Sequence, residues 1–236
     1  MAEAQHIRLF STDQHRCSYL PDQLATLQFV DPELALSDAL VIGLNDNGFR
    51  RSGAHYYRPR CSGCNACTAL RVPVADFRPS RSQQRCLRSN IDLVSRWSHA
   101  AAADHDRYYP LYANYISSRH AEGDMYPPTR EQYDSFIGAG LPSTGYLEFY
   151  LGSDLLMVAQ TDQFGHGLSS VYTFYNPVET KRGLGTYAIL KQIDLANKLG
   201  LPFLFLGYWV EHSPKMAYKQ KFQRHERFLD GRWQRL

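Results

Sequence analysis

Three cysteines, Cys61, Cys64 and Cys67, repeat at intervals of three residues, and two more, Cys17 and Cys86, lie elsewhere. An odd number of close thiols is poor material for a disulfide framework, whereas thiolates at this spacing bind zinc or an iron–sulfur cluster. Either group takes a fourth ligand, and we expect it from Cys17. Cys86 is the alternative, although it lies in a predicted helix, where packing as an apolar side chain is more usual. The residues fit a structural and a redox-sensitive site equally.

Arginine dominates the segment 50–96. It holds ten arginines and only two acidic residues, Asp76 and Asp92, in a chain whose net charge is +3. Because arginine binds phosphate in a bidentate manner and displaces counterions from nucleic acid, this excess favours a phosphate backbone as a partner. A solvated charged surface is the alternative.

A glycine-bearing loop, Lys181-Arg182-Gly183-Leu184-Gly185, leads into an amphipathic segment that runs to Leu199. The N-terminus of a helix attracts anions through its free N–H groups and its dipole. A simple loop at the entry of a helix explains the same residues, since an isolated Gly-x-Gly pattern has little specificity.

The elements that position these groups change character near residue 100, so we expect domains at 1–100 and 101–236. In the first we expect a mixed α+β arrangement. Its elements are a strand at 6–10, a helix from Asp31 to near Gly43, a strand at 70–77 and a basic helix at 80–96.

The second part opens with two helices, 104–121 and 129–139. Beyond Gly145 the pattern predicts an antiparallel meander, then the amphipathic helix ending before Gly200. A strand, a short helix opened by Ser213 and Pro214, and a last strand follow. The strands lie at 146–151, 155–162, 168–175, 202–209 and 228–234. The order β-β-β-α-β-α-β indicates an α+β fold.

Composition excludes several classes. The chain of 236 residues is 44% hydrophobic and 21% charged, as in an ordinary soluble globular protein. Its longest apolar runs, 155–158 and 203–206, are far shorter than the roughly 18 residues of a membrane span. No apolar segment of a secretion signal follows the N-terminus, and no phosphate-binding or dinucleotide-binding loop is present. We therefore expect a cytoplasmic protein.

The order of elements from Tyr146 onward resembles the core of GCN5-related acyltransferases (GNAT), which usually bind acyl-coenzyme A at the helix N-terminus. The coenzyme A signature is damaged here, because Tyr187 stands where a small residue would let the pyrophosphate approach. The resemblance implies acyl transfer from a different donor, with a coenzyme A-dependent N-acetyltransferase as an alternative.

Three longer motifs resemble the arginyl- and leucyl-tRNA–protein transferases. They are Asn45–Gly53, with its Arg-Arg-Ser-Gly block, Leu168–Gly185, with Ser-Val-Tyr-Thr-Phe-Tyr, and Leu206–Lys219, with Lys-Met-Ala-Tyr-Lys. The resemblance spans nearly the whole chain. It implies an aminoacyltransferase that moves Leu or Arg from charged tRNA to the N-terminal Asp or Glu of proteins, marking them for degradation by the N-degron (N-end rule) pathway.

The spacing from Cys61 to Cys67 resembles the bacterial leucyl branch, so leucine is the expected donor amino acid. Arginine is the alternative, which an acidic pocket residue such as Glu148, Asp162 or Glu211 would favour. The aminoacyl ester is already activated, so the chemistry requires no cofactor. A non-enzymatic cysteine-cluster module that binds nucleic acid or senses redox state is a further alternative, which leaves residues 145–236 unexplained.

The resemblance also implies site residues. Positioning should dominate the catalysis, because an α-amine with a pKa of about 7.7–8.0 needs little help from a base. We expect backbone N–H groups around Tyr172–Phe174 and Gly183–Gly185 to stabilise the oxyanion. Tyr208 and Tyr218 are candidate proton donors to the leaving ribose hydroxyl, with simple packing as the alternative.

A cation should bind the acceptor carboxylate, and the expected set lies in the motifs: Arg50, Arg51, Arg182, Lys215 and Lys219, with Ser52 beside them. Contacts of the two adjacent arginines with tRNA phosphate, and simple solvation of the lysines, are the alternatives. Tyr56 and Tyr57 are expected to stack on the unpaired end of the tRNA, unless they pack in a buried strand pair.

Overall fold

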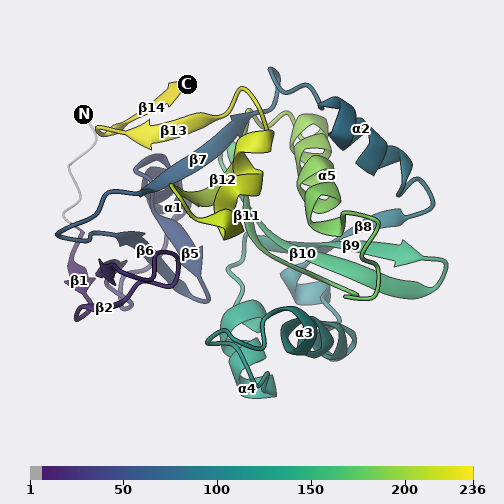
Figure 1. The fold of residues 1–236 in the computed structure, drawn as a ribbon, viewed down its shortest axis with the longest axis horizontal. Coiled ribbons are helices and arrows are strands. Elements are labelled where there is room, and N and C mark those ends of the chain that lie inside the picture. Colours follow the sequence, from purple (N-terminus) through teal and green to yellow (C-terminus); the bar gives the residue numbers. More distant parts are fainter. Residues whose placement is uncertain (1–6, 236) are drawn as a thin grey trace.

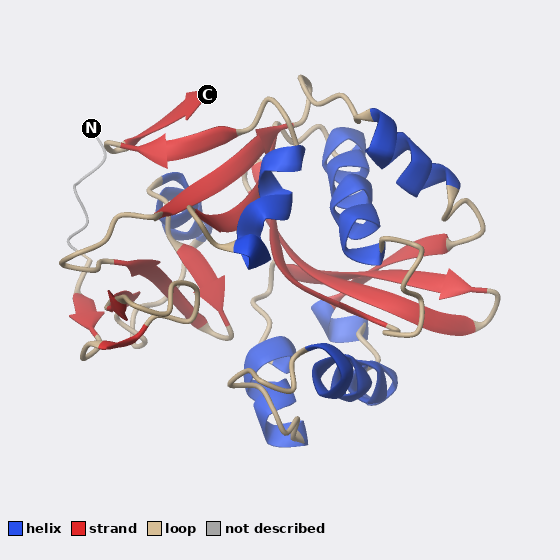
Figure 2. Ribbon diagram, in the orientation of Figure 1, coloured by secondary structure: helices blue, strands red, loops and turns tan. Residues whose placement is uncertain are grey.

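A sheet of eight strands runs through the centre of the molecule (Figures 1 and 2). The computed structural model describes residues 7–235. The strands of this sheet are β7 (Cys67–Pro73), β8 (Val94–His99), β9 (Thr144–Leu151), β10 (Asp154–Phe164), β11 (Gly167–Tyr175), β12 (Phe203–Val210), β13 (Glu226–Leu229) and β14 (Arg232–Arg235). Their spatial order is β14-β13-β7-β12-β11-β10-β9-β8. The predicted antiparallel meander is confirmed as β9, β10 and β11.

Helices cover both faces of this sheet. One face carries α5 (Leu184–Lys198) and α2 (Arg81–Arg88) over apolar side chains such as Phe149 and Leu204. The opposite face carries α3 (His105–Arg119), α4 (Arg130–Tyr133) and the π-helical turn η2 (Asp134–Gly138), packed through tyrosines. The 3-10 turns are η1 (Ala100–Ala102) and η3 (Pro214–Lys221). The molecule is therefore mixed α+β, as predicted.

A second, smaller sheet lies beside the first and has the order β1-β4-β6-β5. Its strands are β1 (Leu9–Ser11), β4 (Leu27–Val30), β5 (Arg50–Ser52) and β6 (His55–Pro59), while β2 (His15–Arg16) and β3 (Leu24–Ala25) form a separate pair. Helix α1 (Asp38–Asp46) packs with Val30 and Tyr56 on one face of this sheet. Because strand residues alternate, Arg50 and Tyr57 project from the other face.

Three predicted elements were wrong. The helix expected from Asp31 begins only at Asp38, because the Asp31 carboxylate accepts a hydrogen bond from the Glu33 amide (3.0 Å) in a local turn, and Ser37 caps the helix. The basic helix expected to reach residue 96 ends at Arg88, and β8 follows. The last strand is the hairpin of β13 and β14, turned at Asp230 and Gly231, where both φ angles are positive.

The expected boundary near residue 100 does not coincide with a break between sheets. Strands β7 and β8 precede it, yet β7 pairs with β12 and β8 pairs with β9. No helix within residues 7–235 is long and apolar enough to cross a membrane.

Strands β11 and β12 run parallel and diverge. They pair only from Gly167 to Ser169 against Phe203 to Phe205. Beyond this point β11 continues to Tyr175 and β12 to Val210, each paired on its other edge with β10 or β7. We call the space between residues 170–175 and 206–210 the wedge. Backbone groups that face it are not used by the sheet.

A buried ion pair ties the small sheet to the large one. The Arg51 guanidinium donates through Nε to Asp162 Oδ2 (2.6 Å) and through Nη2 to Asp162 Oδ1 (2.7 Å), and each side chain is 1% exposed. The remaining N–H groups of Arg51 bond to Gly53, Ala139 and Thr144. Every donor of Arg51 is therefore used within the fold.

The ion pair should dominate the stability of the junction. We expect Asp162→Ala to lower the free energy of unfolding by about 3–5 kcal/mol, because it leaves Arg51 charged and buried without its partner. Urea unfolding measures this change. Asp194→Ala is the matched control, since Asp194 pairs with Lys191 and Lys198 at the surface and should cost less than about 1 kcal/mol. Equal costs for the two variants would contradict the assignment.

Candidate functional site

Arg50 lies where the wedge opens. Its Nη1 donates to Ser169 Oγ (2.9 Å) and its Nη2 to the carbonyl of Ser170 (2.7 Å). On the other side of the wedge, Gly207 has φ +79, and a Cβ at this position would lie 3.1 Å from the Arg50 Nε. Glycine is therefore required at 207 both for the backbone conformation and for the close approach of β12 to the guanidinium.

The charge of Arg50 has no acidic partner. The residue is 6% exposed, and no carboxylate within residues 7–235 forms an ion pair with it. Burial lowers its pKa below the ordinary value. A buried, uncompensated cation is costly, so this position favours binding of an anion.

A second buried cation, Lys219 of η3, lies beside Arg50. Its Nζ donates to the Tyr208 carbonyl (2.6 Å), and the residue is 6% exposed. Burial, and then the charge of Arg50, lower the pKa of Lys219 to about 7. Lys215, on the same short helix, is exposed. The charge of Arg50 and, near pH 7 and below, that of Lys219 therefore lie at one end of the wedge.

The candidate tyrosines occupy different environments. The Tyr208 hydroxyl donates to the carbonyls of Gly48 (2.7 Å) and Tyr57 (3.2 Å), and burial raises its pKa well above the ordinary value. The Tyr172 hydroxyl points at Met125 Sδ (3.6 Å). Tyr218 is 40% exposed and close enough to Arg50 for the cation to oppose the rise of its pKa on burial. Of these three tyrosines, Tyr218 combines exposure with proximity to Arg50.

The entry of α5 is covered by protein. Gly183 has φ +65 before the first turn, which contains Gly185, and the Cys86 thiol donates to the Gly183 carbonyl. Arg182 makes a bidentate pair with Asp92 (2.8 Å for each bond) and a third bond to Glu179 (2.9 Å). Arg182 is thus neutralised by two carboxylates. Among the described residues it shares no bonding partner with Arg50 or Lys219.

Three residues that were predicted to contact substrate lie in β5 or β6 of the small sheet. Tyr56 is 2% exposed in the core under α1, and burial raises its pKa to about 12. It therefore packs in a buried strand pair, which was the alternative to stacking on the tRNA end. Arg51 is committed to Asp162. Ser52 pairs with His55 at the turn between β5 and β6.

The acidic residues that would favour an arginine donor do not offer a free carboxylate to the wedge. Glu148 is fully buried and accepts hydrogen bonds from Tyr108, Tyr150 and Arg96. Asp162 holds Arg51, and Glu211 is exposed beyond the end of β12.

Four cysteines gather near the small sheet. Burial, and after it the nearby thiols of Cys17, Cys61 and Cys64, raise the pKa of the Cys67 thiol to about 12. Cys86 instead bonds to carbonyls at the entry of α5. Within residues 7–235 no three His, Cys, Asp or Glu side chains are arranged as ligands of one metal ion. The thiols are thus neighbours without forming a coordination set in this structure.

The sequence did not single out Ser169 or Gly207, although both lie inside the quoted motifs. Their importance depends on Arg50, which is more than a hundred residues away in the chain. Arg50 donates a hydrogen bond to Ser169 and packs against Gly207. A glycine within an otherwise apolar strand was the one available signal.

Comparison with known proteins gives consistent matches. Residues 15–85 match the family described as arginine-tRNA-protein transferase, N terminus, and residues 107–229 match its C terminus. The chain is 49% identical to the aspartate/glutamate leucyltransferase of Chromohalobacter salexigens, covering 97% of this chain and 93% of that protein. It is 47% identical to the protein of the same name from Saccharophagus degradans, with 99% and 98% covered.

Among solved structures, the C-terminal DUF2156 domain of an Agrobacterium fabrum protein described as a lysylphosphatidylglycerol synthetase aligns with a TM-score of 0.51. The two chains are 11% identical, and the alignment covers 89% of this chain and 80% of that one. The likeness concerns the fold.

The low pKa of Lys219 should appear as a pH-dependent stability. Between about pH 7 and 10.5 the unfolded chain binds a proton at this lysine that the folded chain does not. The free energy of unfolding should therefore rise with pH in this window, by up to about 1.4 kcal/mol per pH unit. Urea unfolding of wild type and Lys219→Met at pH 7, 8 and 9 isolates the effect, because the variant should lack it.

Lys215→Met, on the same helix but exposed, is the control and should keep the pH dependence of the wild type. Parallel curves for wild type and Lys219→Met would show that Lys219 keeps an ordinary pKa.

Proposed function

The chain belongs to the arginine-tRNA-protein transferase family, and from this premise we propose that it transfers leucine from leucyl-tRNA to the N-terminal Asp or Glu of proteins. The observation that carries the proposal is the buried Arg50 at the wedge, with Lys219 beside it and no acidic partner. An acceptor carboxylate supplies the missing negative charge. Transfer of leucine to such proteins marks them for degradation by the N-degron pathway, in the cytoplasm.

Arg50 is the main ligand that we propose for the acceptor side chain. Charge-assisted bonds to a carboxylate are among the strongest hydrogen bonds in proteins. Arg51 and Arg182 are already neutralised by Asp162 and by Asp92 with Glu179, so we leave them out of the substrate site. The exposed Lys215 lies in the first turn of the same short helix as Lys219 and provides steering charge for an acidic N-terminus.

Leucine is the donor amino acid that the surroundings of the wedge favour. The side chains around Tyr172 are aromatic or apolar, including Met125 and Phe136. An arginyl group would need a carboxylate there, and Glu148 and Asp162 are both committed to other partners. The uncharged leucyl side chain makes no such demand.

The transfer itself requires positioning more than acid–base catalysis. The neutral α-amine of the acceptor attacks the ester carbonyl carbon, the C–N bond forms, and the bond to the ribose oxygen breaks. We propose that free N–H groups facing the wedge stabilise the oxyanion, and that Tyr218 donates a proton to the ribose oxygen and takes back the proton that the attacking nitrogen loses. The Tyr208 hydroxyl already donates to two carbonyls and serves to hold β12 against the small sheet.

The fold is best interpreted as GNAT-like, with coenzyme A excluded from its usual place. The entry of α5, where coenzyme A would bind, is covered by the segment that follows α2, and Tyr187 donates to the Asn90 carbonyl (3.2 Å) within it. Asp92 and Glu179 bind the Arg182 guanidinium at this end, so it is not free to bind a pyrophosphate. These contacts argue against the coenzyme A-dependent alternative.

The proposal predicts a specific transfer reaction. Wild-type protein should move radiolabelled Leu, and not Arg, from charged tRNA to model proteins that begin with Asp or Glu, and not to those that begin with Ala. Arg50→Gln should reduce transfer to the Asp protein roughly 10- to 100-fold, because one charge-assisted interaction is lost. Arg88→Gln, at the end of α2, should transfer like wild type.

Circular dichroism and thermal unfolding must show that Arg50→Gln is folded. Equal transfer by folded Arg50→Gln and wild type would refute the role of Arg50. Absence of transfer from both tRNAs by folded wild type would refute the function.

We propose separately that Cys17, Cys61, Cys64 and Cys67 close on zinc or an iron–sulfur cluster when one is supplied. The mutual proximity of the thiols supports this, whereas their present arrangement does not form a ligand set. Iron, sulfide and zinc measured in anaerobically purified protein should show one group per chain, lost in Cys64→Ser and kept in Cys86→Ser. Absence of all three elements from wild type would sink the idea.

A further inference from the structure

One row of side chains crosses all four strands of the small sheet. Phe10 of β1 pairs with Phe29 of β4, Phe29 pairs with Tyr57 of β6, and Tyr57 pairs with Arg50 of β5. Register partners project from the same face, so these four side chains form a continuous row. Three aromatic rings thus lead across roughly 14 Å, three strand spacings, to the cation at the wedge.

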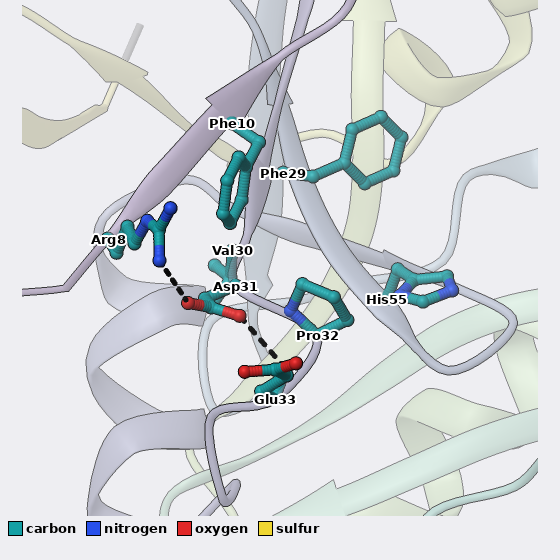
Figure 3. Close-up of a pocket in the computed structure, with 8 residues that line it drawn as sticks. All are labelled: Arg8, Phe10, Phe29, Val30, Asp31, Pro32, Glu33 and His55. Atoms are coloured by element: carbon teal, nitrogen blue, oxygen red, sulfur yellow. Dashed lines mark hydrogen bonds and ion pairs between the residues drawn. The ribbon is translucent and has the colours of Figure 1, made fainter.

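The outer end of this row opens into a pocket of about 520 Å³. Figure 3 shows Phe10 and Phe29 at its top, His55 on one side and the Arg8–Asp31 pair on the other, with Pro32 and Glu33 below. The Phe29 and His55 rings meet edge to face at 6.3 Å. Phe10 is 41% exposed, and the Arg8 guanidinium lies 4.6 Å from the centroid of its ring, so a ligand can stack on the face that Arg8 leaves open.

The chemistry of the pocket fits a nucleobase. Its rings offer stacking surfaces, which take any base, while a carboxylate accepts a hydrogen bond from the exocyclic amino group of cytosine. Asp31 is partly engaged by Arg8 and by the Glu33 amide, whereas the Glu33 side chain is exposed. Arg8, whose side chain is 73% exposed, and the exposed Arg60 just after strand β6 supply positive charge for a phosphate backbone.

We propose that this pocket, at the outer end of the aromatic row, binds an unpaired cytosine of the 3′ end of the donor tRNA. This inference rests on the proposed function, because it assumes a tRNA donor whose aminoacyl ester lies near Arg50. The single-stranded end of tRNA carries cytosines before the terminal adenosine, so a cytosine is held on the row while the ester lies further in. Tyr56, on the opposite face, takes no part.

Binding of deacylated RNA tests the pocket without any transfer reaction. The probe is a fluorescein-labelled RNA hairpin that ends in unpaired CCA, measured by fluorescence anisotropy. Phe10→Leu and Glu33→Ala should each raise its Kd about tenfold, and Phe10→Trp should restore binding because it restores the stacking surface. Replacing one of the two cytosines by uracil should weaken binding to wild type and have no further effect on Glu33→Ala.

Ile91→Ala is the matched control, because Ile91 is an apolar side chain of 87% exposure on the segment after α2, outside the small sheet. Unchanged thermal unfolding shows that each variant is folded. In the transfer assay, Phe10→Leu should raise the KM for leucyl-tRNA and leave the KM for the acceptor protein unchanged.

Three results would overturn the inference: equal affinity of Phe10→Leu and wild type for the hairpin, equal loss of affinity for a hairpin without the unpaired end, or a raised KM for the acceptor protein alone. The last would assign the pocket to the acceptor polypeptide. If wild type transfers no amino acid, the proposed function fails. The anisotropy measurements still show whether the pocket binds the unpaired CCA end.

Discussion

Two adjacent arginines on a short strand define the centre of this molecule. Because strand residues alternate, Arg51 enters the interface between the sheets and Arg50 enters the wedge. Arg51 uses all five donors, with Asp162 as its ion-pair partner, and so fixes β5 against β10. The position of Arg50 between Ser170 and Gly207 depends on this fixed strand. A single buried ion pair thereby places the cation of the candidate site.

The two arginines also differ in electrostatic state, and this difference separates structure from function. Arg51 is compensated by a carboxylate, as buried charges in stable folds are. Arg50 and Lys219 have no carboxylate partner within residues 7–235. The apolar clusters on both sides of the large sheet offset the free-energy cost of burying them. Buried charge without a partner concentrates at functional sites, because a ligand supplies the missing charge. The aromatic row adjoins this site, since its last ring, Tyr57, pairs with the uncompensated Arg50.

Much of the fold could be predicted from local patterns, because β9, β10, β11, α3 and α5 have clear periodicity and turn or capping residues. The errors arose where a side chain bonded to its own neighbourhood, as Asp31 does, or where a turn split a strand at Asp230. The candidate site was less predictable. Motifs identified Arg50, but only long-range contacts distinguish it from Arg51. Tyr56 and Tyr57 are likewise adjacent in the chain. They differ because Tyr56 projects into the core under α1, whereas Tyr57 projects from the opposite face of the small sheet.

The arrangement of the wedge favours direct attack of one substrate on the other. A covalent aminoacyl-enzyme would need an activated nucleophile there, and Ser169 accepts a bond from Arg50, while the Cys67 thiol has a raised pKa. Within the described residues no base is placed to activate either group. The ester and the amine must therefore be bound together, so the wedge has to be reached from two directions. We assign the pocket at the outer end of the aromatic row to the donor, and the exposed Lys215 and Tyr218 of η3 to the approach of the acceptor.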